Sequence, residues 1–332
     1  MSRRRLIIGN LALDGDLILS PMVGYSDLPY RRICREMGSA LNYVPLVVDE
    51  VVIQRARRGL LPIQGGVGEH PLAIQILSKD PQRLVRAAEI LMAYEPDLFD
   101  LNLGCPAKRV VHHGRGAALL RTPEKIAELV RSLVQAIAVP VMAKIRLGWD
   151  ESSRNHLEVA RVLRDSGVSA LAVHGRTWAQ GYGGKADWEA IAEIRQIVDL
   201  PLLANGDVRC AADIAAIRAT TGCDGILIGR GAIGNPWIFA GRDVWDIPYA
   251  ERLRVIRQHL DAMVAHHGPH VGVILFRKHV VCYIQHLDGA AEWRRRLVTC
   301  ETAEGLWQAL QAWQSPAIGE AYGGPNGQAD TC

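Results

Sequence analysis

The sequence reads Asp100-Leu101-Asn102-Leu103-Gly104-Cys105-Pro106-Ala107-Lys108-Arg109 at the point where an apolar run gives way to a loop. Glycine before the cysteine reaches backbone angles that other residues avoid, and proline after it fixes its own angle and restrains the residue before it. We therefore predict that Cys105 lies on a rigid turn at the end of a strand. A thiol held there suits chemistry, whereas a lone cysteine is otherwise a buried packing residue.

Seven more short apolar runs occur along the chain, and helical patterns lie between them. Runs that are apolar throughout are typical of parallel strands buried on both faces. The eight runs are Leu17–Met22, Leu41–Val48, Leu72–Leu77, Leu98–Leu103, Val139–Ile145, Ala170–His174, Pro201–Ala204 and Gly225–Ile228. The helical segments include Leu28–Met37, Pro81–Ala93, Pro123–Ile137, His156–Ser166, Asp187–Ile197 and Ala211–Thr221. This alternation predicts an α/β fold, a (β/α)8 TIM barrel.

Polar residues stand at the ends of seven of these eight strands. In a TIM barrel the carboxyl ends of the strands form one face, and active sites are built there. The groups are Pro21-Met22, Gln75, Asn102 with Cys105, Lys144-Ile145-Arg146, His174-Gly175-Arg176-Thr177, Asn205-Gly206-Asp207 and Gly229-Arg230-Gly231. Their concentration at one face predicts an enzyme active site in the mouth of the barrel.

The pattern changes after Pro248, where helices follow one another without strands. The predicted helices are Glu251–His267, Ile274–His286 and Glu304–Trp313. Between residues 251 and 296 there are eight Lys/Arg and four Asp/Glu, a net charge of +4. We predict a catalytic barrel domain over residues 1–245, a small all-α domain over 246–315, and a disordered tail over 316–332, which is rich in glycine and polar residues.

Composition is that of an ordinary globular protein, with 22% charged and 49% hydrophobic residues among 332. No apolar run is long enough for a membrane span, and the short apolar stretch near the N-terminus meets acidic residues too early for a signal peptide. We expect a cytoplasmic monomer with no membrane partner. The seven cysteines form no CxxC pair, which argues against a disulfide framework and a zinc site, so no metal is expected.

The loops after the last two strands combine glycines, backbone N–H groups and one guanidinium. Loops at these positions of a TIM barrel commonly bind phosphate, although such glycine-rich sequences also make ordinary turns. Lys144 would end a buried strand and needs an anionic or electron-rich partner, and Gln75 can hold a ring with amide-like edges. These features suit flavin mononucleotide (FMN). No GxGxxG fingerprint follows the first strand, so a tightly held NAD is not predicted.

Together, these motifs resemble the tRNA-dihydrouridine synthases, and most closely the bacterial B-type branch. The resemblance covers roughly residues 10–290 and is carried by Ser20-Pro21-Met22, Gln75, the segment 100–106, Lys144-Ile145-Arg146-Leu147-Gly148-Trp149, His174-Gly175-Arg176-Thr177, Ala186-Asp187-Trp188, Asn205-Gly206-Asp207, Gly229-Arg230, Asn235-Pro236-Trp237-Ile238-Phe239 and Arg277-Lys278-His279. It implies an FMN-bound barrel with a helical C-terminal domain, which uses NADPH to reduce the C5–C6 double bond of specific uridines in tRNA to 5,6-dihydrouridine.

The same resemblance implies roles for the residues at the mouth. Cys105 would be the catalytic acid, which donates a proton. The positions that match the FMN site are Pro21, Met22, Val23, Gln75, Lys144, His174, Asn205, Gly206, Asp207, Gly229 and Arg230. The positions expected at the substrate are Asn102 and Arg176 in the barrel and Lys278 and His279 in the helical domain.

Three places depart from the family pattern. Pro45-Leu46 stands where the second strand usually ends in Glu-Met, with Asp49 and Glu50 displaced along the chain. Arg115 stands between two glycines, where a small residue is usual, and it would contact a phosphate or be solvated. Cys282 replaces an aromatic residue. We expect activity to survive these changes and substrate choice to be altered.

Two other functions remain open at this stage. One is an FMN-dependent barrel oxidoreductase that acts on a small molecule, and the basic helical appendage argues against it. The other is a non-catalytic RNA-binding protein that keeps the fold, and the presence of Cys105, Lys144 and His174 argues against it.

Overall fold

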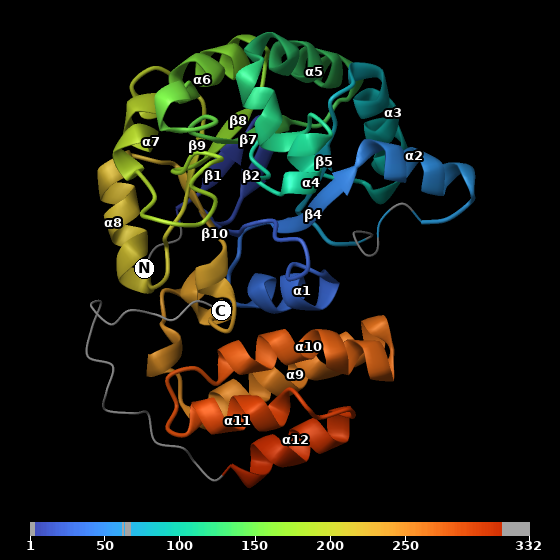
Figure 1. Ribbon diagram of the computed structural model, residues 1–332, viewed down its shortest axis with the longest axis vertical. Helices are drawn as coiled ribbons and strands as arrows, with labels where there is room; N and C mark the ends of the chain where they lie inside the picture. The colour runs from blue at the N-terminus through green and yellow to red at the C-terminus, as the bar shows by residue number, and fades with distance from the viewer. Residues whose placement is uncertain (1–3, 62, 64–67, 314–332) are drawn as a thin grey trace.

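The computed structural model describes residues 4–61, 63 and 68–313, and it contains the predicted barrel (Figure 1). Eight parallel strands form one sheet in the order β3-β10-β9-β8-β7-β6-β5-β4. They are β3 (Leu17–Leu19), β4 (Asn42–Val48), β5 (Leu72–Leu77), β6 (Leu98–Asn102), β7 (Val141–Arg146), β8 (Ala170–His174), β9 (Leu202–Asn205) and β10 (Gly225–Ile228). Each strand coincides with one of the eight predicted runs to within a few residues, so the predicted (β/α)8 barrel is confirmed.

The sheet closes where β3 meets the residues that precede β4. Ala40 N–H donates to the Leu17 carbonyl at 2.8 Å, and Leu19 N–H donates to Ser39 Oγ at 3.0 Å. These bonds take the place of a ladder between β3 and β4, and closure covers the edge that an open sheet would expose.

Side chains along each strand alternate between the barrel interior and the surrounding helices, because successive strand residues point to opposite faces. On the inward face the amino ends of the strands are apolar and the carboxyl ends are polar. Ala73, Leu98, Met142, Ala170 and Leu203 belong to the interior core, and Gln75, Asn102, Lys144, His174 and Asn205 follow on the same face and line a cavity. The polar ends of five strands therefore meet in one layer at the mouth of the barrel.

A hairpin that the sequence analysis did not predict closes the apolar end of the barrel. Its strands β1 (Leu6–Ile8) and β2 (Leu11–Leu13) pair antiparallel. Leu6 and Leu13 are buried within the interior core. Strands of three residues are too short to show a period of two, so no pattern in the chain predicts them.

Helices surround the barrel in Figure 1. They are α1 (Leu28–Glu36), α2 (Asp49–Arg57), α3 (Pro81–Leu91), α4 (Lys108–His112), α5 (Pro123–Ala136), α6 (His156–Asp165), α7 (Trp188–Arg195) and α8 (Ala211–Thr221). Short 3₁₀ helices span Met92–Tyr94, Gly116–Arg121, Glu151–Ser153, Arg230–Ala232, Pro236–Ala240 and Val244–Asp246. The sequence analysis missed α2 and α4; α2 begins directly at the end of β4, and α4 has only five residues.

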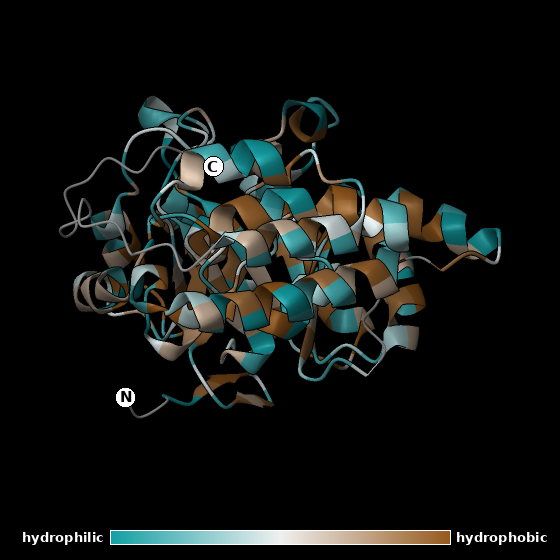
Figure 2. Ribbon diagram, turned by 90° about the horizontal axis from the view of Figure 1, so that it is seen from below, coloured by the Kyte–Doolittle hydropathy of each residue, from teal (hydrophilic) through white to brown (hydrophobic). Residues whose placement is uncertain are grey.

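Four helices follow the barrel, and Figure 1 shows them grouped below it, next to α1. They are α9 (Tyr249–His267), α10 (Pro269–Tyr283), α11 (Ala290–Leu297) and α12 (Ala303–Ala312). Figure 2 shows this side of the molecule, where hydrophobic and hydrophilic residues alternate along the helices. The sequence analysis missed α11, because three consecutive arginines interrupt its apolar pattern. The predicted tail, 316–332, lies outside the described residues.

Helix α1 joins the barrel to this helical unit. Tyr30 stacks on His259 with ring centroids 5.4 Å apart, and Gln258 Nε2 donates to Glu36 Oε2 at 2.6 Å. Ile33 belongs to the hydrophobic core of the helical unit. Within the described residues, none of the helices combines the length and the apolar character that a membrane span requires.

Candidate active site at the mouth of the barrel

A cavity of about 1070 Å³ opens at the carboxyl ends of the strands. Its lining contains Cys105, Asn102 and all the positions predicted for FMN, which are Pro21, Met22, Val23, Gln75, Lys144, His174, Asn205, Gly206, Asp207, Gly229 and Arg230. The described residues that line it do not include Arg176, Lys278 or His279. The fold thus brings together most of the predicted site residues, from seven strand ends, in one cavity.

Cys105 lies on a turn that follows β6, in agreement with the sequence-based prediction. Asn102 Oδ1 accepts hydrogen bonds from the backbone N–H groups of Gly104 at 3.2 Å and Cys105 at 2.9 Å. Arg146 Nε donates to the Gly104 carbonyl at 2.9 Å. Asn102 and Arg146 are both buried, so the turn is fixed from beneath while the cysteine remains partly exposed at the cavity.

Two tryptophans brace the same turn from the side. Trp178 Nε1 donates to the Pro106 carbonyl at 3.1 Å. The ring of Trp178 stacks on that of Trp149 with centroids 3.9 Å apart, and the guanidinium of Arg121 lies 4.9 Å from the Trp149 centroid. The loops after β7 and β8 therefore support the loop that carries the cysteine.

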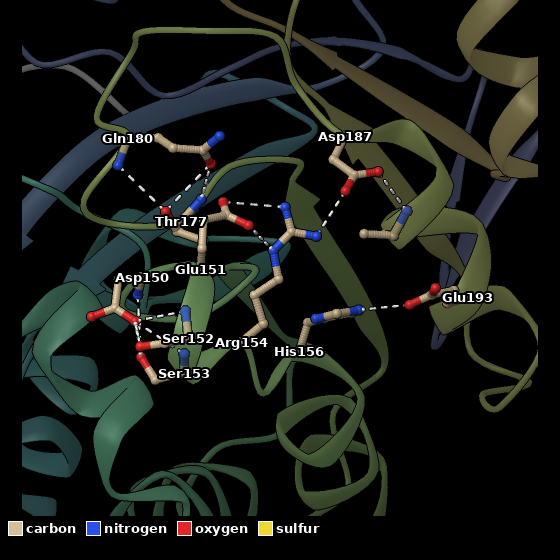
Figure 3. Close-up of polar contacts among 11 residues, drawn as sticks. Asp150, Glu151, Ser152, Ser153, Arg154, His156, Thr177, Gln180, Asp187 and Glu193 are labelled. Carbon is tan, nitrogen blue, oxygen red and sulfur yellow. Dashed lines mark hydrogen bonds and ion pairs between the residues drawn. The ribbon is translucent and has the colours of Figure 1, made fainter.

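Polar contacts tie these two loops together and to α7 (Figure 3). Arg154 Nη1 donates to Asp187 Oδ2 at 2.7 Å, across the space between the loops. Asp150 closes the first loop by accepting from backbone N–H groups, and Gln180 Oε1 closes the second by accepting from Thr177 N–H at 2.7 Å. These residues support the wall of the mouth without lining the cavity.

A buried chain of polar groups runs from the cysteine turn into the barrel. Asn102 Nδ2 donates to Gln75 Oε1 at 2.7 Å, and Gln75 Nε2 donates to Asp100 Oδ2 at 2.6 Å. The Tyr43 hydroxyl donates to the same carboxylate oxygen. Burial raises the pKa of Asp100 to about 7. Asp100 was not predicted as a site residue, although it stands two residues before Asn102 and therefore faces the same way.

We predict that Asp100→Asn reduces the pH dependence of stability. Burial favours the neutral carboxyl, so between the ordinary value of 3.8 and about 7 the folded protein binds more protons than the unfolded chain. The contribution of Asp100 is therefore largest in acid and declines as the pH rises through this window, by at most about 1.4 kcal/mol per pH unit. Urea unfolding across this window should show a shallower slope for the variant, and equal slopes would contradict the prediction.

Lys144 and His174 place a cation next to a neutral imidazole. Lys144 Nζ donates to Asn205 Oδ1 at 2.9 Å. Burial, with a smaller effect from Arg146, lowers the pKa of Lys144. Burial, reinforced by the Lys144 ammonium, holds the pKa of His174 well below its ordinary value. The imidazole is therefore uncharged near neutral pH. Its Nε2 accepts from Arg176 Nη1 at 3.3 Å, which leaves Nδ1 as the donor.

The loop after β9 packs too closely against the loops after β8 and β10 for side chains at two glycine positions. Gly206 has a φ of +123°, and a Cβ there would lie 2.7 Å from the nearest side-chain carbon. A Cβ on Gly231 would lie 2.2 Å from the Val208 carbonyl oxygen. Arg230 stands exposed at the rim of the cavity between these glycine positions. This wall therefore offers backbone groups and the guanidinium groups of Arg209 and Arg230, the arrangement expected of a phosphate site.

Arg176 does not reach the cavity, contrary to the prediction that it meets the substrate. Its side chain is 1% exposed. Its Nη2 lies 2.8 Å from both carboxylate oxygens of Asp207, and its Nε donates to the Gly183 carbonyl at 2.9 Å. Arg176 therefore holds the turn that carries Asp207, and every hydrogen bond it makes is to another part of the barrel.

Arg146 and Tyr182 also line the cavity; Arg146 was predicted at the mouth without a role of its own, and Tyr182 was not predicted. Arg146 Nη1 donates to the carbonyls of Thr177 at 2.9 Å and Gly181 at 2.7 Å. The exposed ring of Tyr182 lies 5.5 Å from the guanidinium carbon of Arg146 and 5.2 Å from that of Arg230. The place of Arg146 at the mouth follows from sequence, because it comes two residues after Lys144 on one strand. Tyr182 lies in a loop without any periodic signal.

Lys278 and His279 lie where the helical unit meets the barrel. The His279 side chain has no exposed surface and packs against Tyr30 with ring centroids 4.9 Å apart, so the structure contradicts the prediction that it contacts RNA. Lys278 Nζ donates to the Gly24 carbonyl and lies 5.1 Å from the ring centroid of Tyr25. Tyr25 lines the cavity, so Lys278 ties the helical unit to the cavity wall.

Arg115 was expected either to contact a phosphate or to be solvated, and both expectations are wrong. Its side chain is 8% exposed and is paired with carboxylates. Of the other two departures, Leu46 lines the cavity and Cys282 is buried in the helical unit. Among the described residues, no three His, Cys, Asp or Glu side chains lie together in a way that could hold a metal ion.

Among solved structures, a complex of 2-naphthoyl-CoA reductase with 2-naphthoyl-CoA matches with a TM-score of 0.55 at 10% sequence identity. The match covers 73% of this chain, and the chain spans about half (52%) of that protein. At this level of identity the match concerns the fold alone, and it agrees with the barrel described above.

Sequence relatives match over nearly the whole chain. The tRNA-dihydrouridine synthase B of Pseudomonas syringae pv. tomato is 35% identical over 331 residues, which is 97% of each chain. That of Pseudomonas aeruginosa is 38% identical over 295 residues, covering 86% of this chain and 89% of the relative. The family profile described as Dihydrouridine synthase (Dus) matches residues 18–318. The chain therefore belongs to the dihydrouridine synthase family, flavin-dependent enzymes that reduce uridine in tRNA.

Proposed function

We propose that this protein binds FMN in the barrel mouth, takes electrons from NADPH, and reduces the C5–C6 double bond of specific uridines in tRNA, with Cys105 as the proton donor. The observation that carries the proposal is the lining of one cavity by Cys105, Lys144 and His174 together with the loops after β9 and β10. Because residues of one chain line this cavity, we also propose that the protein acts as a monomer.

The cavity fits FMN in size and in chemistry. Ligand pockets usually measure roughly 300–1,000 Å³, so a cavity of about 1070 Å³ has room for a flavin and a base above it. The Lys144 ammonium has three hydrogens, and Asn205 is the only acceptor it meets among the described residues. The remaining hydrogens suit the electron-rich edge of a flavin ring. Gly206 and Arg230 suit the phosphate, since backbone N–H groups and guanidinium bind phosphate oxygens.

When bound, FMN would supply the hydride that adds to C6 of the uracil ring. The residues of the chain would do the rest. Addition at C6 moves negative charge toward the C4 oxygen and leaves C5 in need of a proton. The Cys105 thiol would deliver that proton from a turn held by Asn102 and Arg146, and the neutral His174 imidazole would offer a hydrogen bond to the developing charge.

NADPH is proposed as a visiting reductant and not as a resident cofactor. The first strand lacks the glycine fingerprint that holds a dinucleotide tightly. A coenzyme that reduces the flavin and leaves would free the mouth for the uridine. The Tyr182 ring is exposed at the rim between Arg146 and Arg230. It offers an aromatic surface to NADPH or to the uridine.

We propose that residues 1–245 form the catalytic domain and that residues 246–315 bind tRNA. A uridine must leave its stack to reach the cavity, at a cost of a few kcal/mol. Contacts between basic side chains and phosphates can offset this cost. Exposed basic residues stand both at the cavity rim and on α11, and they are Lys108, Arg109, Arg209, Arg294, Arg295 and Arg296.

The purified full-length protein tests the proposal. We expect it to carry noncovalent FMN and, with NADPH, to add two hydrogens to defined uridines of a tRNA transcript, which mass spectrometry of nuclease fragments will locate. A protein without flavin would contradict the proposal and favour the non-catalytic RNA-binding function. Rapid turnover of a small unsaturated carbonyl compound, with no reduction of tRNA, would favour the small-molecule reductase.

A further inference from the structure

The loop that follows Cys105 is fastened to the barrel by a charge cluster far from it in sequence. Arg115 Nη2 lies 2.9 Å from Glu50 Oε1 and 3.3 Å from Asp49 Oδ1. Arg83 approaches the same two carboxylates from α3, with its Nη1 2.9 Å from Glu50 Oε1. Ser78 Oγ donates to Asp49 Oδ2 at 2.6 Å. The cluster therefore joins the loop, the start of α2 and α3.

The rest of this loop is held by few side chains. Helix α4, which forms most of it, has no fully buried residue among its five, and Val111 packs partly buried against the barrel core. Trp178 donates to the Pro106 carbonyl at the start of the loop. Apolar burial within α4 is therefore limited to a small contact. Arg115, which follows α4, is buried, and its partner Asp49 has no exposed side-chain surface. The ion pairs of Arg115 accordingly add a buried charged attachment to the apolar contact of Val111 with the barrel.

The residues that follow Arg115 in the chain connect its ion pairs to Cys105. Gly116 has a φ of +61°, and a Cβ built there would lie 3.0 Å from the Cys105 carbonyl oxygen and 3.1 Å from Cys105 Cβ. Ala117 N–H donates to that same carbonyl at 3.3 Å. Gly116 and Ala117, which are both buried, thus lie directly against the back of the cysteine, and Arg115 is the residue that leads into them.

We propose that Arg115 is a positioning residue for Cys105: its ion pairs with Asp49 and Glu50 fix the segment 115–117 that lies behind the cysteine and so set where the thiol stands in the cavity. The proposal rests on the proposed role of Cys105 as proton donor. It also joins two departures from the family pattern, since the displaced acids after β4 and the arginine in the glycine loop are partners. A proton donor displaced by about 1 Å can lose on the order of 100-fold in rate.

Arg115→Gln tests this directly. We expect kcat for dihydrouridine formation to fall by about 10- to 100-fold, with KM for tRNA and the rate of flavin reduction by NADPH nearly unchanged. A second readout does not need catalysis. The rate at which iodoacetamide alkylates Cys105, followed on its peptide by mass spectrometry, should rise several-fold because the loop is no longer held.

Three further variants separate positioning from stability. Glu50→Gln removes the partner whose side chain is 41% exposed and leaves Asp49 paired, so it should fold like wild type and show both effects in weaker form. Arg83→Gln removes the ion pairs of α3 with Asp49 and Glu50 but leaves those of Arg115, so it should show neither effect. Arg115→Lys keeps the charge and should restore part of kcat.

Wild-type kcat and wild-type alkylation in both Arg115→Gln and Glu50→Gln would overturn the proposal. So would an equal loss in Arg83→Gln, because the effect would then belong to general stability. If Arg115→Gln does not fold, Glu50→Gln decides the matter alone. A wild-type protein that makes no dihydrouridine would refute the proposed function, while the alkylation rates would still test the attachment.

Discussion

Cys105→Ala is expected to keep its FMN and its reduction by NADPH, and to form dihydrouridine about 100- to 10,000-fold more slowly than wild type, the usual contribution of a general acid. The reason is that C5 would have to take its proton from water. The turn should keep its conformation, because the hydrogen bonds of Asn102 and Arg146 are made to backbone atoms of Gly104 and Cys105 and not to the sulfur. Stopped-flow measurements of flavin reduction and of its reoxidation by tRNA separate the two half-reactions.

Cys300→Ala provides the matched control for this experiment. Cys300 is also partly exposed, but it lies in the helical unit, and its backbone carbonyl, which the substitution preserves, accepts the hydrogen bonds from Arg277. It should behave like wild type. Full dihydrouridine formation by Cys105→Ala would refute the assignment of Cys105 as the acid, whereas a loss of flavin binding would show that the cysteine has a structural part in the cofactor site.

Lys144→Met is expected to slow the reduction of bound FMN by NADPH by roughly 100-fold and to lower the reduction potential of the flavin. A cation fixed beside the ring stabilises the negative charge that reduction adds, and removing one such preorganised group commonly costs about 100- to 1,000-fold in rate. Methionine keeps the length of the side chain and its apolar contacts, so the barrel should remain packed. The hydrogen bond to Asn205 is lost along with the charge.

Lys125→Met is the control, because Lys125 is an exposed lysine on α5. It should match wild type in flavin content, potential and rate. An unchanged flavin potential in Lys144→Met would mean that the ammonium does not face the ring. The proposal that the edge of the flavin ring lies at Lys144 would then be wrong. The assignment of Cys105 as the acid would not be affected.

Local pattern was enough to predict the barrel and most of its mouth. Continuous apolar runs located all eight strands, and the turn at Cys105 followed from its flanking glycine and proline. The polar residues Gln75, Asn102 and Lys144 each end a strand, and the alternation of side chains along a strand sends them to the same face as the interior core. These features depend on a few neighbouring residues, which is why they can be read from the chain itself.

The partners of charged and aromatic side chains were decided only by the tertiary structure. Arg176 forms an ion pair with Asp207, and Arg115 forms ion pairs with Asp49 and Glu50. His279 is buried against Tyr30, which lies near the other end of the chain. The sequence of a motif is the same whether its arginine or histidine side chain faces a ligand or another part of the protein. Its role depends on which distant segment folding brings beside it, because the cost of burying a charge is met by whichever opposite charge lies within reach.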